Sequence, residues 1–161
     1  MVWLCEYCGC QQVAVVSELT VEHDTLRNLG HDLATAANEG DLAAARSLAA
    51  SMRAVLGPHT EVEERGLFPA LAADFSEQLD CLVDEHRSID AALADLVSDA
   101  PPALWRHQTR LALAHLFDHI LKEQDGVFPA ALSTLTPADW DSVSAVRDRA
   151  HRVVRVLPVA S

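Results

Sequence analysis

Two eleven-residue segments repeat one pattern, and this repeat most constrains the fold of the chain. The first runs from His59 to Pro69 and the second from His119 to Pro129, with a spacing of 60 residues. Each carries a histidine, a glutamate four positions later, and glycine, phenylalanine and proline at matching offsets. On an α-helix, residues four apart share a face and lie about 6 Å apart along the axis. Each segment therefore offers an imidazole nitrogen and a carboxylate oxygen to one metal site.

The rest of the chain is typical of packed helices. A chain of 161 residues, of which 50% are apolar, is long enough for one domain with a buried core. Only 5% of the residues are aromatic, which favours helices over sheets. Gly40 is a predicted helix stop, Asp41 a predicted cap, and Ser76 the predicted start of a third helix. Residues 99–102 break that helix, and residues 136–139 combine the signals that start a last one.

These signals predict an all-α protein, an antiparallel up-down-up-down four-helix bundle with an additional C-terminal helix. Short connections between long helices favour antiparallel neighbours, and the two halves are expected to be related helical hairpins. We divide the chain into a cysteine-containing N-terminal segment, the bundle, and a C-terminal helix with a tail. Their ranges are 1–16, 17–135 and 136–161.

Each predicted bundle helix carries a histidine on its apolar stripe. A single histidine in such a place is usually a hydrogen-bonded core residue. Four of them are harder to explain that way, particularly since two glutamates share the stripes and would cost several kcal/mol each if buried unpaired. Metal coordination compensates all six side chains together. The candidate ligands are His23, His59, Glu63, His86, His119 and Glu123.

The ligand types narrow the choice of metal. Imidazoles and carboxylates without cysteine suit iron, manganese or zinc. Zinc usually takes four ligands around one ion, whereas a carboxylate from each of two helices can bridge two ions. A pair of iron or manganese ions therefore fits the repeated motif.

The order of these motifs resembles the hemerythrin-like, or HHE cation-binding, domain family over about residues 17–135. The segments Glu-Glu-Arg-Gly-Leu-Phe-Pro and Lys-Glu-Gln-Asp-Gly-Val-Phe-Pro carry the resemblance. It implies a non-haem di-iron centre inside a four-helix bundle. By position, it implies that the four histidines are terminal ligands and that Glu63 and Glu123 bridge the irons.

The chain departs from the oxygen-carrying members of that family, which have a fifth histidine. Those members have two histidines on one helix, whereas here Leu82 occupies the place one turn before His86. His115, one turn before His119, is either a fifth ligand or a residue that supports or lines the site. His31 is a weaker candidate. We expect the other polar candidates to be solvated or at the surface, namely Glu61, Glu64, Asp125, His107 and His151.

A second candidate metal site lies at the N-terminus. Cys5, Cys8 and Cys10 form a Cys-x-x-Cys-x-Cys cluster, which is typical of thiolate metal binding or redox exchange. Zinc and iron–sulfur clusters normally take four ligands, and nothing in the sequence places Cys81 nearby. A reactive tail is the alternative.

Charge and hydropathy limit the partners. The 12 basic and 24 acidic residues give a net charge of −12, which argues against nucleic-acid and anionic-membrane binding. The sequence shows no apolar run that would span a bilayer and no secretory signal, so we expect a cytoplasmic protein. It predicts no particular protein partner.

The resemblance implies binding of a small ligand such as dioxygen, peroxide or nitric oxide. Our preferred hypothesis is a protein that binds or senses such oxidants. A di-iron enzyme that decomposes peroxide or nitric oxide is one alternative. Repair of iron–sulfur clusters is another, by loose analogy with relatives that carry an N-terminal cysteine. A ferritin-like oxidase fits less well, since its motif is Glu-x-x-His.

Overall fold

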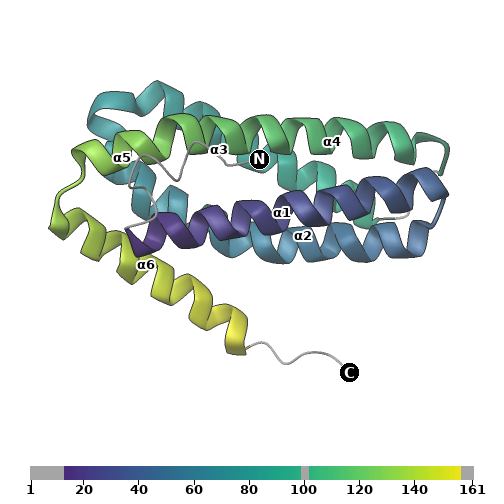
Figure 1. Cartoon of the computed structure of the whole chain (residues 1–161), viewed down its shortest axis with the longest axis horizontal. Coiled ribbons are helices and arrows are strands. Elements are labelled where there is room, and N and C mark those ends of the chain that lie inside the picture. The colour runs from purple at the N-terminus through teal and green to yellow at the C-terminus, as the bar shows by residue number, and fades with distance from the viewer. Residues whose placement is uncertain (1–12, 99–101, 157–161) are drawn as a thin grey trace.

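The computed structural model describes residues 13–98 and 102–156, and within these ranges it contains helices and no strands (Figure 1). Around the bundle, α1 contacts α2 and α4, and α3 contacts the same two helices. The described chain is therefore a helical bundle. Its α-helices are α1 (Ala14–Glu39), α2 (Leu42–Val62), α3 (Phe68–Val97), α4 (Pro102–Lys122), α5 (Phe128–Thr134) and α6 (Pro137–Val156).

The ends of the helices follow the predicted local signals. Gly40 ends α1 with a φ of 79°, the left-handed conformation that glycine adopts without strain. The Asp41 side chain accepts a hydrogen bond of 3.0 Å from the amide of Ala44 and so caps α2. Thr136 and Asp139 exchange hydrogen bonds in a capping box at the start of α6. These interactions confirm the predicted caps.

The two copies of the repeated motif form π-helical turns, η3 (Glu63–Leu67) and η4 (Glu123–Val127). The amides of Phe68 and Phe128 donate to the carbonyls of Glu63 and Glu123, five residues earlier. The proline that follows each phenylalanine has no amide hydrogen, so it cannot restore the ordinary helical bond at that point. Such single π-turns are frequent at functional sites. Here both turns begin at a candidate metal ligand.

The second and third predicted helices are joined by a bend at Phe75. Its φ of −134° and ψ of 24° are not helical, although helical hydrogen bonding continues on both sides. A new direction after Phe75 agrees with the helix predicted to start at Ser76. In Figure 1 the chain turns back here at one end of the bundle.

Two apolar clusters lie on either side of the candidate ligands along the bundle. One contains Leu19 and Leu82, four residues before His23 and His86, and the other contains Leu26 and Ile89, three residues after them. The histidines therefore form a polar layer between two apolar layers. None of the described helices contains an apolar stretch that is long enough to cross a membrane.

The sequence, read in steps of four, predicts an inward stripe of Leu111, His115, His119 and Glu123 on the fourth helix, and this prediction is partly wrong. Leu111 is 56% exposed, whereas Ala112, Leu116 and Ile120 are buried. Repeated steps of four residues rotate about 40° per step around a helix of 3.6 residues per turn. A stripe extended backward from His119 by fours therefore leaves the core within two steps.

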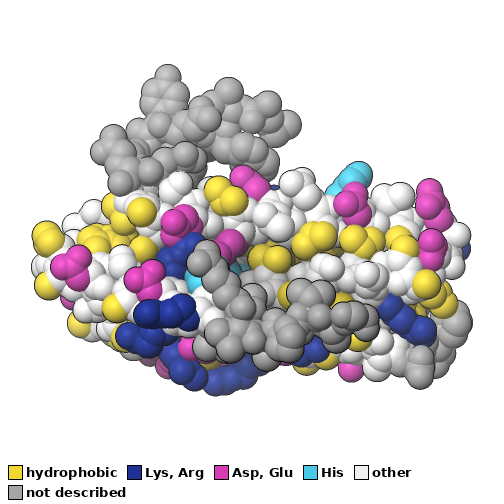
Figure 2. All heavy atoms as spheres, turned by 90° about the horizontal axis from the view of Figure 1, so that it is seen from below, with side chains coloured by type: hydrophobic (Ala, Val, Ile, Leu, Met, Phe, Trp, Pro, Cys, Tyr) yellow, Lys and Arg dark blue, Asp and Glu magenta, His cyan; other side chains and the backbone are white. Residues whose placement is uncertain are grey.

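Helix α6 crosses η3 at Gly66, where the absence of a side chain permits close contact. A Cβ atom on Gly66 would lie 3.3 Å from Val143 Cγ1 and 3.4 Å from Val143 Cα. The matching Gly126 in η4 has no such neighbour within 4 Å. Val143 and Ala150 are buried, so α6 contributes apolar residues to the core. Figure 2 views the molecule from the side of α6 and shows most of the visible Lys and Arg side chains at the lower left of this face.

We expect Gly66→Leu to destabilise the protein, because the new side chain must displace Val143. Overpacking of this kind costs about 1–3 kcal/mol, or a decrease in Tm of roughly 3–10 °C for a chain of this size. Thermal unfolding followed by circular dichroism measures the change. Gly126→Leu is the matched control, and it should not lower the Tm. An equal loss of stability in both variants would contradict this packing role of Gly66.

Candidate metal centre

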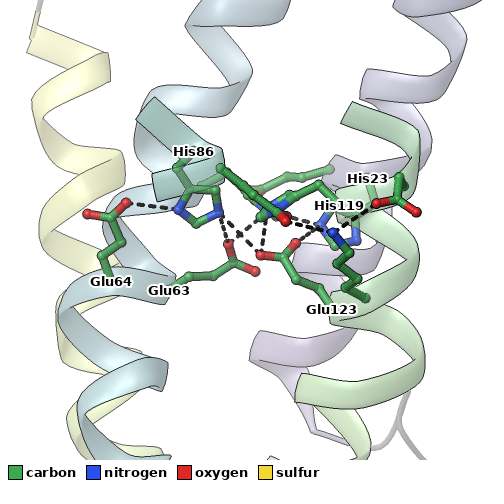
Figure 3. Close-up of polar contacts among 11 residues, drawn as sticks. His23, Glu63, Glu64, His86, His119 and Glu123 are labelled. Carbon is green, nitrogen blue, oxygen red and sulfur yellow. Dashed lines mark hydrogen bonds and ion pairs between the residues drawn. The ribbon is translucent and has the colours of Figure 1, made fainter. Parts of the chain in front are cut away.

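Six buried side chains from four helices and two π-turns meet in the layer between the apolar clusters. His23 comes from α1, His59 from α2, His86 from α3 and His119 from α4, while Glu63 and Glu123 begin η3 and η4. Each of the six is at most 3% exposed. Figure 3 shows the labelled members directed toward a common centre. The structure thus brings together the six side chains that the sequence singled out.

Their donor atoms form two overlapping groups. The first consists of His23, His59, Glu63 and Glu123, and the second of His86, His119 and Glu123. Within each group the donor atoms lie within 4.8 Å of one another. Glu123 belongs to both groups, with Oε2 3.1 Å from His23 Nε2 and Oε1 3.2 Å from His86 Nε2.

Glu63 also lies between the two groups. Its Oε2 atom is 3.4 Å from His59 Nε2 and 3.3 Å from His86 Nε2. Glu63 and Glu123 therefore occupy related places, each between histidines of different helices. Two carboxylates so placed match the geometry required to bridge a pair of ions.

The outer nitrogens of three histidines contact carboxylates. The Nδ1 atoms of His59, His86 and His119 each lie 2.8 Å from a glutamate oxygen. A carboxylate there accepts the Nδ1 proton, so that Nε2 presents its lone pair to the centre of the site. The partners are Glu22, Glu64 and Glu85, respectively.

Sequence reasoning missed these three glutamates as parts of the site. Glu64 was expected to be solvated, but its side chain is 34% exposed and contacts His86 from the side opposite Glu63 (Figure 3). The only sequence signal is that each glutamate adjoins a candidate ligand. Adjacent residues point about 100° apart on a helix, so the glutamate contacts a histidine of a neighbouring helix. That contact depends on how the helices pack.

Basic side chains hold two of these glutamates in place. Lys122 Nζ donates to Glu85 Oε1 at 2.6 Å, and this interaction helps to keep the pKa of Glu85 below its usual value despite partial burial. From α6, Arg147 Nη2 and His151 Nε2 lie 3.9 Å and 3.4 Å from Glu22 Oε1. Helix α6 thereby contacts the site through Glu22, and His151 is not simply a surface residue.

Several inward-facing atoms lack a hydrogen bond, and a metal would satisfy them. Both oxygens of Glu63 and Nε2 of His119 are buried without a hydrogen-bond partner. The Nε2 atoms of His23 and His59 face each other at 3.0 Å. Buried carboxylate oxygens are costly unless they are paired or bind a cation. The donor set and these unsatisfied atoms therefore fit metal binding.

Burial and charge shift the pKa values of the histidines in opposite directions. Burial opposes protonation of His59, but Glu63 and Glu22 outweigh it and raise the pKa to about 9. For His86, the nearby carboxylates of Glu123 and Glu63 likewise overcome burial and raise the pKa to about 10. Burial dominates at His23 and lowers its pKa. Close contacts with His119, His23 and His86 hold the pKa of Glu123 well below its usual value despite burial.

We expect the metal-free protein to lose stability as the pH rises from about 7 to 10. His59 and His86 have folded-state pKa values above their unfolded value of 6.5, so their stabilisation is complete below pH 6.5 and is lost through pH 9–10. The lowered pKa of His23 acts only below pH 6.5. Thermal unfolding of chelator-treated protein should show a Tm decrease of at least ~5 °C across this range. A flat profile would contradict the assigned charge pairs.

The remaining sequence candidates lie apart from the six donors. His115 is half-buried beside a separate surface hollow with Asp95 and Gln108, and it belongs to neither donor group. Four residues span one helical turn plus about 40°, so His115 points to one side of His119, and Leu111 points further away still. His31, His107 and Asp125 are exposed. Glu61 is partly exposed and pairs with Arg65 on the surface. Cys5, Cys8 and Cys10 lie outside the described residues, and Cys81 is an exposed free thiol.

Four histidines and two glutamates buried at the centre of a helical bundle define a metal-binding helical protein. Residues 14–131 match the family model of the hemerythrin HHE cation binding domain. The chain therefore belongs to this family. Parallel searches of curated proteins and of solved structures gave no match. The matched range ends before α6, which lies outside the family domain.

Proposed function

We propose that this protein binds two non-haem iron ions and uses them to bind or sense dioxygen or a related small oxidant, such as peroxide or nitric oxide. The observation that carries the proposal is the convergence of two buried donor groups on one shared carboxylate, Glu123. Membership of a cation-binding family supports it independently.

In this proposal each donor group holds one ion. His23 and His59 would hold the first, His86 and His119 would hold the second, and Glu63 and Glu123 would be shared by both. An antiparallel up-down-up-down course of α1 to α4 is part of the proposal, and the ring of helix contacts supports it. Iron is favoured over zinc because zinc usually takes four ligands around a single ion.

A bound di-iron pair would supply redox-active ions at which a small oxidant binds and accepts electrons. The protein provides the conditions for this chemistry. Glu22, Glu64 and Glu85 fix the tautomers of their histidines and increase the basicity of the inward nitrogens. The apolar clusters on both sides exclude bulk water, which strengthens electrostatic interactions inside the site.

Metal analysis of the purified, iron-supplemented protein tests the proposal first. We expect about two iron ions per chain and charge-transfer absorption that changes when the reduced protein meets dioxygen or peroxide. One zinc ion per chain, or no bound metal, would refute it. Reversible spectral change without turnover would indicate a binder or sensor. Sustained dioxygen evolution from peroxide, above that of free iron, would instead indicate the di-iron enzyme.

A further inference from the structure

The two halves of the site differ in their access to the surface. Beside His86, a hollow of about 510 Å³ opens between α2 and α3. Gly57, Thr60 and Glu64 line it, and a Cβ atom on Gly57 would meet nothing within 4 Å. The exposed side chains of Arg53 and Asp90 also line the hollow and pair with each other at 2.8 Å. The hollow therefore connects solvent with the outer side of His86.

The corresponding place beside His23, between α4 and α1, is filled by side chains. Sixty residues after Gly57 stands Phe117, whose ring packs on α1 so closely that a Cβ atom on Gly30 would lie 2.9 Å from its Cζ atom. Gln124 corresponds to Glu64 in the repeat. Its Oε1 atom accepts a 2.8 Å hydrogen bond from Arg27 Nη2, which links η4 to α1. Glycine on one side and phenylalanine on the other thus distinguish two otherwise similar halves.

Each half offers two histidines, and both glutamates approach histidines of both halves. The group that contains His86 has three members, whereas the group that contains His23 has four. Leu82, one turn before His86, is apolar and supplies no further donor. Glu63, the fourth member of the His23 group, also lies close to the other half, with Oε2 3.3 Å from His86 Nε2. The surface hollow, not the number of donors, therefore distinguishes the two halves.

We propose that the outside ligand enters between α2 and α3 and binds at the ion held by His86 and His119, while the ion held by His23 and His59 is closed to it. This inference rests on the proposed di-iron function and specifies which ion reacts. The ligand class is a small anion or diatomic molecule. Two arginines and two carboxylates line the hollow, so their charges balance and both neutral and singly charged small ligands can enter.

Azide binding to the iron-loaded, oxidised protein tests the route. Stopped-flow absorption should show that Gly57→Leu slows azide association at least tenfold, because the leucine side chain fills the hollow. Azide dissociation should slow equally and leave the dissociation constant within twofold of wild type, since the ions and ligands are unchanged. Gly57→Ala should give a smaller decrease. Because Pro58 follows and disfavours a side chain on the preceding helical residue, circular dichroism and iron content must match wild type before the rates are compared.

Gly126→Leu is the matched control, because Gly126 lines a separate hollow of about 750 Å³ between α3 and η4, whose lining includes Leu82 and Glu85 but none of the histidine donors. Its association rate should stay within twofold of wild type. Unchanged kinetics in an iron-loaded Gly57→Leu protein would overturn the route and leave the di-iron proposal intact. A higher dissociation constant for azide with an unchanged association rate would also overturn the route. A wild-type protein that takes up no iron would refute the proposed function itself.

Mössbauer spectra of protein loaded with iron-57 test which ion binds azide. Azide should shift one of two quadrupole doublets, and Glu64→Gln should perturb that same doublet because Glu64 contacts His86. If Glu64→Gln perturbs only the doublet that azide leaves unchanged, the ligand binds at the other ion and this assignment is wrong.

Discussion

Replacing Glu123 with glutamine should remove almost all bound metal, from about two ions per chain to fewer than 0.2. Among the described residues Glu123 is the member common to both donor groups, and its oxygens approach His23, His86 and His119 within 3.2 Å. An uncharged amide cannot bridge two cations, and it also leaves the buried histidines without their main anionic partner. Both ions should therefore be lost together.

Inductively coupled plasma mass spectrometry on the purified variant measures this loss, with circular dichroism as a check of the helical fold. Asp125→Asn is the matched control, because it makes the same chemical change in η4 at an exposed residue. The control should retain the wild-type metal content. Glu123→Gln protein that keeps two tightly bound ions would show that the shared carboxylate does not hold them.

Removal of a glutamate that orients a histidine should weaken metal binding by about 10–100-fold without abolishing it. We expect this effect for Glu22→Ala and Glu85→Ala, which occupy matching places, one residue before His23 and one before His86. Each accepts a hydrogen bond from Nδ1 of a histidine on the next helix along the chain. Without the carboxylate, that histidine loses both its fixed tautomer and part of its basicity.

Competition with a chromophoric chelator gives the affinities of these variants. Glu61→Ala is the control, since Glu61 pairs only with Arg65 at the surface, and it should bind metal as wild type does. Equal affinity in all three variants would contradict an orienting role. A larger loss in Glu22→Ala than in Glu85→Ala would indicate that Arg147 and His151 reach the site through Glu22.

Helix α6 extends the site beyond the family domain. It lies outside residues 14–131, yet Val143 packs against Gly66 and Arg147 approaches Glu22. The η4 half has no such cover at Gly126. The two repeated halves therefore differ in two contacts. Helix α6 covers η3 but not η4, and Phe117 packs against Gly30 where the other half has Gly57.

Errors in the sequence predictions have identifiable causes. Leu111 and His115 were aligned with His119 by steps of four, but the helix repeat is 3.6 residues, so both turn away from the core. The π-turns were not predicted, although each phenylalanine–proline pair supplied the signal. Glu64 was expected in solvent because its partner, His86, comes from another helix.

The sequence by itself determined the helical class, the caps and the six side chains directed to one layer. Helical periodicity and spacing are local properties, so a repeat of histidine and glutamate four apart places both on one face wherever the helix forms. Only the tertiary structure decided which glutamate supports which histidine and which half opens to solvent. Those features depend on packing between helices, where Gly57 leaves space and Phe117 fills it, and no local spacing specifies such contacts.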